Sequence, residues 1–186
     1  MVPADPDGRA VIEVERRALA GQLRADTAGR KLTGYAAVFS QDTRIGSFTE
    51  RIAAGAFRAS LSAGSDVLAL ADHDPARLLA RTRSGTLRLA EDARGLAFDL
   101  DVPDTQLGHD ILALAQRGDL GGASIGFRVV DDHWSAADRR ELRAVELVEV
   151  SIVQAFPAYP QTSVVARSWA TRTMTPAARR RLIDTL

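Results

Sequence analysis

The chain has no cysteine. Disulfide bonds, thiolate catalysis and cysteine-ligated metals are therefore excluded. It also has no excess of charge, because 24 basic residues balance 24 acidic ones, and this argues against nucleic-acid binding, which normally needs a basic excess. No apolar run approaches the roughly 18 residues of a membrane span, and the N-terminus lacks the apolar segment of a signal peptide. These absences predict a soluble, cytoplasmic protein with neither a membrane nor a nucleic-acid partner.

The length and the apolar content predict one folded domain. A chain of 186 residues with 46% hydrophobic residues has enough apolar surface for a real core, so neither a metal nor another cofactor is expected as a staple. Residues 1–10 are rich in turn formers and are expected to be disordered. The domain is predicted over 11–167. Residues 168–186 are expected to form a basic tail that ends in a short helix, with Thr175 as its N-cap and Pro176 in its first turn.

The pattern along the domain is mainly strand-like, with a few helices (an α+β chain). Two hairpins are expected over 17–39 and 86–102, and a third pair of strands, 123–130 and 143–153, flanks the polar segment "DDHWSAADRR", which is expected to be a loop. Helices are predicted within 55–64 and 104–119, with Asp104 or Thr105 capping the second and Gly118 ending it. Many short strands between turn signals favour a closed or bent antiparallel β-barrel flanked by these helices.

Ser124 lies between Gly122 and Gly126 in the pattern G-x-S-x-G. In α/β-hydrolases this pattern places the nucleophile between a strand and a helix. Here a predicted helix precedes the pattern and a strand-like run follows it, which disfavours an esterase of that type. With a period of two, the serine and both glycines share one strand face, and the apolar residues within 123–129 share the other. Ser124 is therefore either a nucleophile that a substrate can approach closely or a small residue at a bend in the strand.

A serine nucleophile needs a base beside it. The chain has three histidines, His73, His109 and His133. His109 is near the start of a predicted helix and His133 is in the polar segment. His73 follows a strand-like apolar run and is the best candidate on position, although a surface histidine between two aspartates would look the same. The further histidine and carboxylate ligands of a metal phosphohydrolase are missing.

Two glutamates, Glu146 and Glu149, interrupt the apolar strand "RAVELVEVSIV". Burying a carboxylate in a core strand costs free energy unless it is paired, so each glutamate is expected to have a charged or hydrogen-bonding partner. Alternation predicts that they lie on opposite faces, so that only one points toward Ser124. The pattern does not say which glutamate orients the histidine.

Several segments together resemble the prohead (capsid maturation) proteases of tailed bacteriophages, a family distantly similar to the herpesvirus assemblins. The resemblance runs from about Leu32 to Arg167. It is carried by "LTGYAAVF", "FTERIAAGAF", "ADHD", "LARTRSGTLRLAEDARGLAFDLDVPDT", "RGDLGGASIGF" and "LVEVSIVQAFPAYPQT". The order and spacing of these segments make the resemblance specific, and it implies a herpesvirus-protease-like fold.

The resemblance implies a catalytic role for three residues. His73 of "ADHD" corresponds to the general base and Ser124 of "GASIGF" to the nucleophile. Assemblins use a second histidine as the third member, but a glutamate stands at a similar interval here, and that interval selects Glu149 over Glu146. A carboxylate can orient and stabilise an imidazolium at least as well as an imidazole can. The segment "AFPAYP", residues 155–160, either shapes the substrate cleft or is a structural turn.

The implied function is that of a serine endopeptidase acting in the host cytoplasm, inside the procapsid. Its expected partners are the phage scaffold and major capsid proteins and the chain itself, through self-cleavage in the basic tail. No cofactor or metal is implied. A non-catalytic assembly module of the same fold is the alternative. The cleavage-site preference, the oxyanion-hole donors and a homo-oligomeric state stay open.

Overall fold

A computed structural model describes residues 13–20 and 23–155 of the chain. The elements of these residues follow in chain order: β1 (Glu15–Leu19), β2 (Arg24–Asp26), β3 (Lys31–Val38), β4 (Thr43–Ile45), β5 (Phe48–Ile52), α1 (Arg58–Ser62), β6 (Leu68–Ala71), β7 (Asp74–Arg81), β8 (Leu87–Glu91), β9 (Gly95–Asp101), α2 (Gln106–Arg117), β10 (Gly122–Ala136) and β11 (Arg139–Val153). The prediction of a mainly β chain with a few helices is confirmed. The predicted N-terminal disorder over 1–10 and the predicted tail over 168–186 lie outside the described residues.

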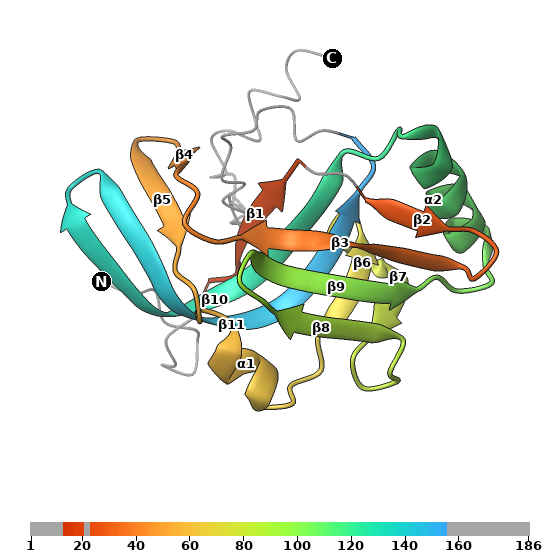
Figure 1. The fold of residues 1–186 in the computed structure, drawn as a ribbon, viewed down its shortest axis with the longest axis horizontal. Helices are drawn as coiled ribbons and strands as arrows, with labels where there is room; N and C mark the ends of the chain where they lie inside the picture. Colours follow the sequence, from red (N-terminus) through yellow and green to blue (C-terminus); the bar gives the residue numbers. More distant parts are fainter. Residues whose placement is uncertain (1–12, 21–22, 156–186) are drawn as a thin grey trace, which may run out of the picture.

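The larger of two sheets is built around the long hairpin of β10 and β11 (Figure 1). β1 pairs with β10 on one side, and β5 pairs with β11 on the other, followed by β4. β5, α1 and β6 follow the same edge of β11 in succession. β5 pairs with residues 139–142 and β6 with residues 149–152, both in parallel. As a result, the turn that follows β6 is placed next to the C-terminal end of β11.

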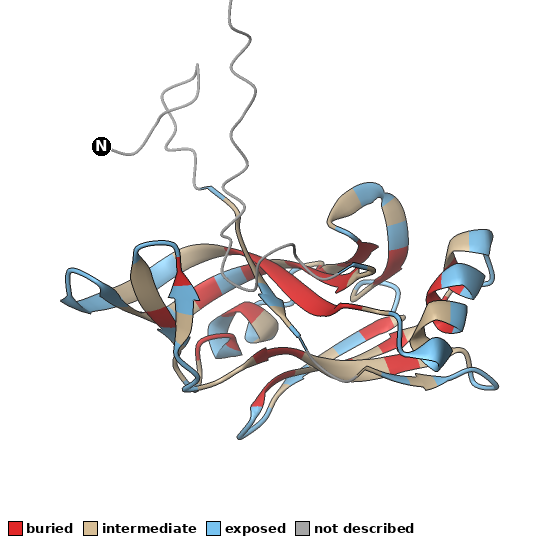
Figure 2. Cartoon of the chain, turned by 90° about the horizontal axis from the view of Figure 1, so that it is seen from above, coloured by how far each residue is buried: buried red, intermediate tan, exposed pale blue. Residues whose placement is uncertain are grey.

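The smaller sheet, in the order β2-β3-β9-β8, crosses the hairpin (Figure 1). The β8–β9 hairpin confirms the prediction over 86–102. The hairpin predicted over 17–39 is confirmed only in part, because β2 and β3 form it, whereas residues 17–19 belong to β1 and pair with β10 in the larger sheet. Its apolar side chains, including Leu32, Leu96 and Phe98, pack with Ile125 and Phe127 of the larger sheet in one buried core. Figure 2 shows buried positions gathered along the facing strands and exposed ones on the outer side of α2.

Both predicted helices are present. α1 follows the buried Phe57. Gly64, just beyond the end of α1, has a positive φ of 67°. In α2 the cap is Thr105 rather than Asp104, because the Thr105 side chain accepts a hydrogen bond from the N–H of Gly108. Gly118 ends α2 in the left-handed conformation that a residue without a Cβ adopts without strain.

Two sequence-based predictions need correction. The described strands form two open sheets, with β1 and β4 at the ends of the larger one, and no closed barrel is found among them. The sheet is also not purely antiparallel, because α1 returns the chain to its earlier direction between β5 and β6. The segment 131–140, expected as a loop, belongs mostly to β10 and β11. Its polar residues hide the strand pattern, since this end of the hairpin extends into solvent and has no apolar face.

Candidate active site

Ser124 lies in the middle of the larger sheet. Its strand neighbours are Ala18 on β1 and Ser151 on β11. The predicted alternation holds, because Ala123, Ile125 and Phe127 point into the core. A strand continues after the serine, so the strand–turn–helix context of an α/β-hydrolase nucleophile is absent there. The serine is only 1% exposed, and its hydroxyl donates to the backbone carbonyl of Arg17 at 3.0 Å.

His73 lies in the two-residue turn that joins β6 to β7, beyond the end of an apolar strand as predicted. Asp72 and His73 have φ angles of 52° and 62°, and two consecutive positive φ values are what a type I′ hairpin turn requires. This conformation is uncommon for residues other than glycine, although asparagine, aspartate and histidine adopt it more often than most. A histidine held in it is an observed strain of the kind found at functional sites.

Asp72 fastens this turn to the end of β11. Its N–H donates to the carbonyl of Ile152 at 3.0 Å, and its carboxylate accepts from the N–H of Gln154 at 2.9 Å. The same carboxylate pairs with Arg77 at 2.6 Å. Asp72 is an exposed turn residue, and these contacts fix the backbone from which the His73 ring extends.

Glu149 accepts a hydrogen bond from His73, with 2.7 Å between Oε1 and Nδ1. The Glu149 side chain is 5% exposed. It also accepts hydrogen bonds from Arg16 Nε, at 3.1 Å to Oε1, and from the Ser151 hydroxyl, at 3.3 Å to Oε2. Burial raises the pKa of Glu149, but the hydrogen bond and charge of His73, followed by those of Arg16, outweigh burial and hold the pKa below its usual value. The carboxylate is therefore ionised at neutral pH.

Gly126 lets the Glu149 side chain lie across β10. It pairs directly with Glu149, and a Cβ at Gly126 would come within 2.6 Å of both Cγ and Oε1 of that glutamate. Real Cβ atoms do not approach so closely, so Gly126 of the G-x-S-x-G pattern makes room for the side chain of Glu149.

Glu146 lies on the same sheet face as Glu149, contrary to the alternation argument. Phe127 pairs with Leu147 and Gly126 with Glu149, so Val148 is an extra residue in β11. Such a bulge shifts the alternation by one position. Glu146 is exposed and pairs with Arg128 at 3.2 Å, away from His73.

The other histidines lie elsewhere. His109 is on the surface of α2, where its Nε2 is 2.9 Å from the carboxylate of Asp104. His133 is in the solvent-exposed end of β10 and pairs with Glu141 across the hairpin. Within the described residues, no group of three or more acidic or histidine side chains is arranged to hold a metal ion.

The structure thus brings His73 and Glu149 into contact and places Ser124 on the same sheet face. Ser151 links the two parts, because it lies directly opposite Ser124 and its hydroxyl donates to Glu149. No hydrogen bond joins Ser124 to His73 here, since the serine hydroxyl is bonded to Arg17. A serine, an imidazole and an ionised carboxylate are the groups that acyl transfer by a serine nucleophile requires, and of these the imidazole and the carboxylate are in contact.

Sequence reasoning missed Arg16 and Ser151. Arg16 belongs to none of the segments that carry the resemblance, and β1 is more than 100 positions from Glu149 in the chain. Ser151 lies in the segment "LVEVS", but no pattern there marks it as a partner of Glu149. The glycines around Ser124 indicate that another group lies close to the backbone of this strand, but the pattern does not identify that group as the Glu149 side chain.

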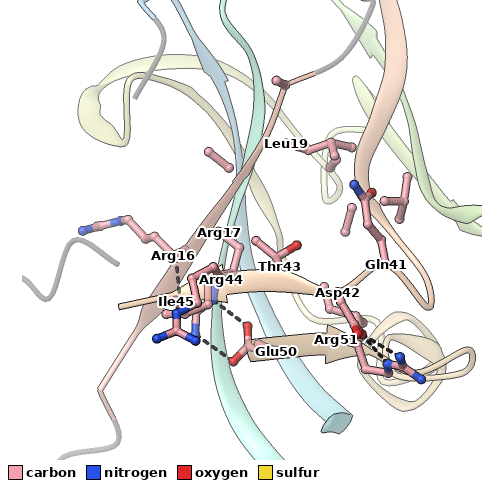
Figure 3. A pocket seen from close by; sticks show the side chains of 16 residues that line it. Arg16, Arg17, Leu19, Gln41, Asp42, Thr43, Arg44, Ile45, Glu50 and Arg51 are labelled. Carbon is pink, nitrogen blue, oxygen red and sulfur yellow. Dashed lines mark hydrogen bonds and ion pairs between the residues drawn. The ribbon is translucent and has the colours of Figure 1, made fainter. Parts of the chain in front are cut away.

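A cavity of about 320 Å³ lies beside β1 (Figure 3). It is lined by residues 16–19 of β1 with the following Ala20, by the end of β3 and by the β4–β5 hairpin. The Arg17 side chain extends from β1 to the buried Glu50, with 2.6 Å between Nε and Oε1. Figure 3 shows this ion pair on the cavity wall. His73, Ser124 and Glu149 do not line the cavity, but Ala18, which does, is the pairing neighbour of Ser124.

Comparison with known families decides the identity. The family model described as "Caudovirus prohead serine protease" matches residues 17–176, which is most of the chain. The chain belongs to this family. The prohead protease is accordingly a serine peptidase, a hydrolase of bacteriophage capsid maturation, and the predicted family resemblance is confirmed. Searches of curated proteins and of solved structures give no match.

Two further points about the prohead protease concern membrane-spanning helices and the segment "AFPAYP". Among the helices of its described residues, none is long and apolar enough to cross a membrane. All of the "AFPAYP" segment after Ala155 lies outside the described residues, so its predicted role in the cleft stays a prediction.

Proposed function

We propose that Ser124 is the nucleophile, His73 the general base and Glu149 the residue that orients and charge-stabilises the imidazole. The proposal rests above all on the 2.7 Å contact between His73 Nδ1 and Glu149 Oε1, on the sheet face that carries a glycine-flanked serine. The substrate is the scaffold protein, or the scaffold-like arm of the major capsid protein, and the chain also cleaves its own basic tail. The reaction takes place inside the procapsid in the host cell.

The ionised carboxylate sets the tautomer of His73. A carboxylate without a proton can only accept hydrogen bonds, so the Nδ1 that faces Glu149 carries the hydrogen. The Nε2 atom of the neutral ring then has a free lone pair and is able to accept the proton of Ser124. Glu149 in turn stabilises the imidazolium that this transfer creates.

The reaction follows from these roles. The Ser124 oxygen attacks the carbonyl carbon of a peptide bond while its proton passes to His73. When the tetrahedral intermediate collapses, the C–N bond breaks and His73 gives its proton to the leaving amine. Water, deprotonated by the same ring, then attacks the acyl-enzyme, releases the carboxylic acid and restores the serine. Backbone amides that stabilise the oxyanion contribute about 3–4 kcal/mol each in other enzymes.

The buried serine must be uncovered for this reaction. Its hydroxyl has to leave the Arg17 carbonyl, and a substrate strand has to reach it. This opening is assigned to the part of β1 beside the serine, residues 17–19, and it leaves Arg16 in place at Glu149. The Arg17–Glu50 ion pair anchors this part of β1, so opening costs free energy, and contacts with the bound substrate offset that cost.

The test is co-expression of the protease with the phage capsid and scaffold proteins. Ser124→Ala is expected to lower cleavage by several orders of magnitude while the melting temperature stays close to that of the wild type. Ser135→Ala is the matched control, because Ser135 is an exposed residue of the same strand. In parallel, a fluorophosphonate probe should label the wild type in a His73-dependent manner. Near-normal cleavage by Ser124→Ala would defeat the assignment.

Self-cleavage has its own readout. Mass spectrometry of the incubated wild type should show loss of residues near the C-terminus, and Ser124→Ala should keep them. A wild-type chain that stays intact after long incubation with active enzyme would contradict cleavage of the tail.

A further inference from the structure

Arg16 contacts the same carboxylate oxygen as His73. Its Nε lies 3.1 Å from Glu149 Oε1, and His73 Nδ1 lies 2.7 Å from that atom. Arg16 is on β1, His73 is in the β6–β7 turn and Glu149 is on β11, so three separate elements meet at one oxygen. The other oxygen receives the hydroxyl of Ser151. Both carboxylate oxygens therefore have hydrogen-bond donors.

The strand register makes this contact specific. Arg16, Gly126 and Glu149 are direct neighbours across β1, β10 and β11, so their side chains share one row on one face. The middle residue has no side chain, and the Glu149 carboxylate extends over it toward Arg16. A side chain at position 126 would block the row, which ties the glycine beside the serine to the arginine contact.

The charges explain why the contact matters for catalysis. While His73 is neutral, Arg16 is the one cationic side chain in contact with Glu149 among the residues that the structure describes. A buried carboxylate without a cation is costly and tends to take up a proton. A proton held between Glu149 and His73 would leave the ring unable to accept the proton of a serine.

We propose that Arg16 is a positioning residue that keeps Glu149 ionised, and thereby keeps the hydrogen of neutral His73 on Nδ1 and its Nε2 free. The inference rests on the proposed roles of Ser124, His73 and Glu149. It goes beyond them because it adds a residue from the N-terminal edge strand, outside the segments "ADHD", "GASIGF" and "LVEVS".

Other charged groups near His73 are already engaged. Asp72 pairs with Arg77, and Asp74 accepts a hydrogen bond from the N–H of Ala76. Both aspartates are on the turn or on β7, whereas Glu149 contacts His73 from β11 and Arg16 contacts Glu149 from β1. Loss of the Arg16 charge would thus leave the Glu149–His73 pair with one more uncompensated negative charge. The pair would keep its extra proton to higher pH.

The experiment compares Arg16→Gln with Arg16→Lys and with Arg128→Gln. The rate constant for fluorophosphonate labelling of Ser124 is measured from pH 5 to 9. For Arg16→Gln the acid limb is expected to move up by about one pH unit, with a loss of about tenfold at neutral pH. Arg16→Lys keeps the charge and should keep the wild-type profile. Arg128→Gln removes the partner of Glu146 on the same face and should change neither quantity.

A second readout does not depend on activity. The ring-nitrogen NMR signals of His73 should report an Nδ1–H tautomer in the wild type and in Arg16→Lys, and an added proton at neutral pH in Arg16→Gln. Superimposable pH profiles and unchanged ring signals in Arg16→Gln would overturn the inference. If Arg16→Gln does not fold, a shifted profile in Arg16→Lys would also overturn it. Full activity of Ser124→Ala would instead refute the proposed function, so the two failures are distinguishable.

Discussion

Gly126→Ala is the substitution that most directly tests the geometry of the site. The added Cβ would lie 2.6 Å from both Cγ and Oε1 of Glu149, whereas ordinary contact begins at 3.4 Å. The carboxylate must therefore retreat by about 0.8 Å, a distance that would stretch its 2.7 Å bond to His73 to the limit of a hydrogen bond. Gly126 is not among the glycines with a positive φ, so its backbone can accept alanine.

The expected result of Gly126→Ala is a loss of catalysis without a loss of fold. A misplacement of about 1 Å near the reacting groups costs roughly 10²-fold in rate, or about 2.7 kcal/mol of transition-state stabilisation. The assay is the rate constant for labelling Ser124 with a fluorophosphonate probe, together with the melting temperature. A variant that labels within about threefold of the wild-type rate would refute the argument that Gly126 makes room for Glu149.

Gly34→Ala is the matched control. A Cβ at Gly34 would lie 2.9 Å from Leu23 Cδ2 and 3.2 Å from the Phe98 ring, in the smaller sheet. The steric strain is similar, but no atom of the candidate site is touched. We expect Gly34→Ala to lose about 1–3 kcal/mol of folding stability through overpacking and to keep its labelling rate.

Two further predictions concern stability. His73→Gly should be more stable than His73→Ala by about 1 kcal/mol, because glycine adopts the positive φ of this turn without strain, and both should be inactive; equal free energies of unfolding would contradict the strain. The lowered pKa of Glu149 implies stability that is present above its ordinary value of 4.5 and is lost as the pH falls through the folded-state value. The difference in unfolding free energy between the wild type and Glu149→Gln should accordingly shrink below about pH 4.5, and a constant difference from pH 6 to pH 3 would contradict the ion pairing.

Local signals were enough for the elements that depend on neighbours in sequence. The cap at Thr105 and the stop at Gly118 define α2, and the turn residues between β8 and β9 define their hairpin. Such signals failed where tertiary contacts compete with them. The bulge at Val148 is one case, because the N–H of Leu147 next to it bonds to the Ser60 hydroxyl of α1, a contact between residues 87 positions apart.

The polar end of the β10–β11 hairpin is another case. Its strands show no apolar alternation, because charge pairs rather than a buried face accompany the extended chain. Arg140 contacts Asp132 at 2.7 Å and Glu15 at 2.9 Å, and β5 pairs alongside. The hydrophobic pattern of β11 alone cannot reveal these partners, because they come from three other strands, β10, β1 and β5.

The sequence by itself determined the family, the mainly β character and the residue types of a serine peptidase site, because these depend on composition, local turn chemistry and motifs. The family interval pointed to Glu149, but its contact with His73 and the sharing of its carboxylate by Arg16 were decided by the tertiary structure. The reason is physical: the register of β1, β10 and β11, together with one bulge, sets which side chains share a row. Register arises from pairing between strands that are far apart in the chain.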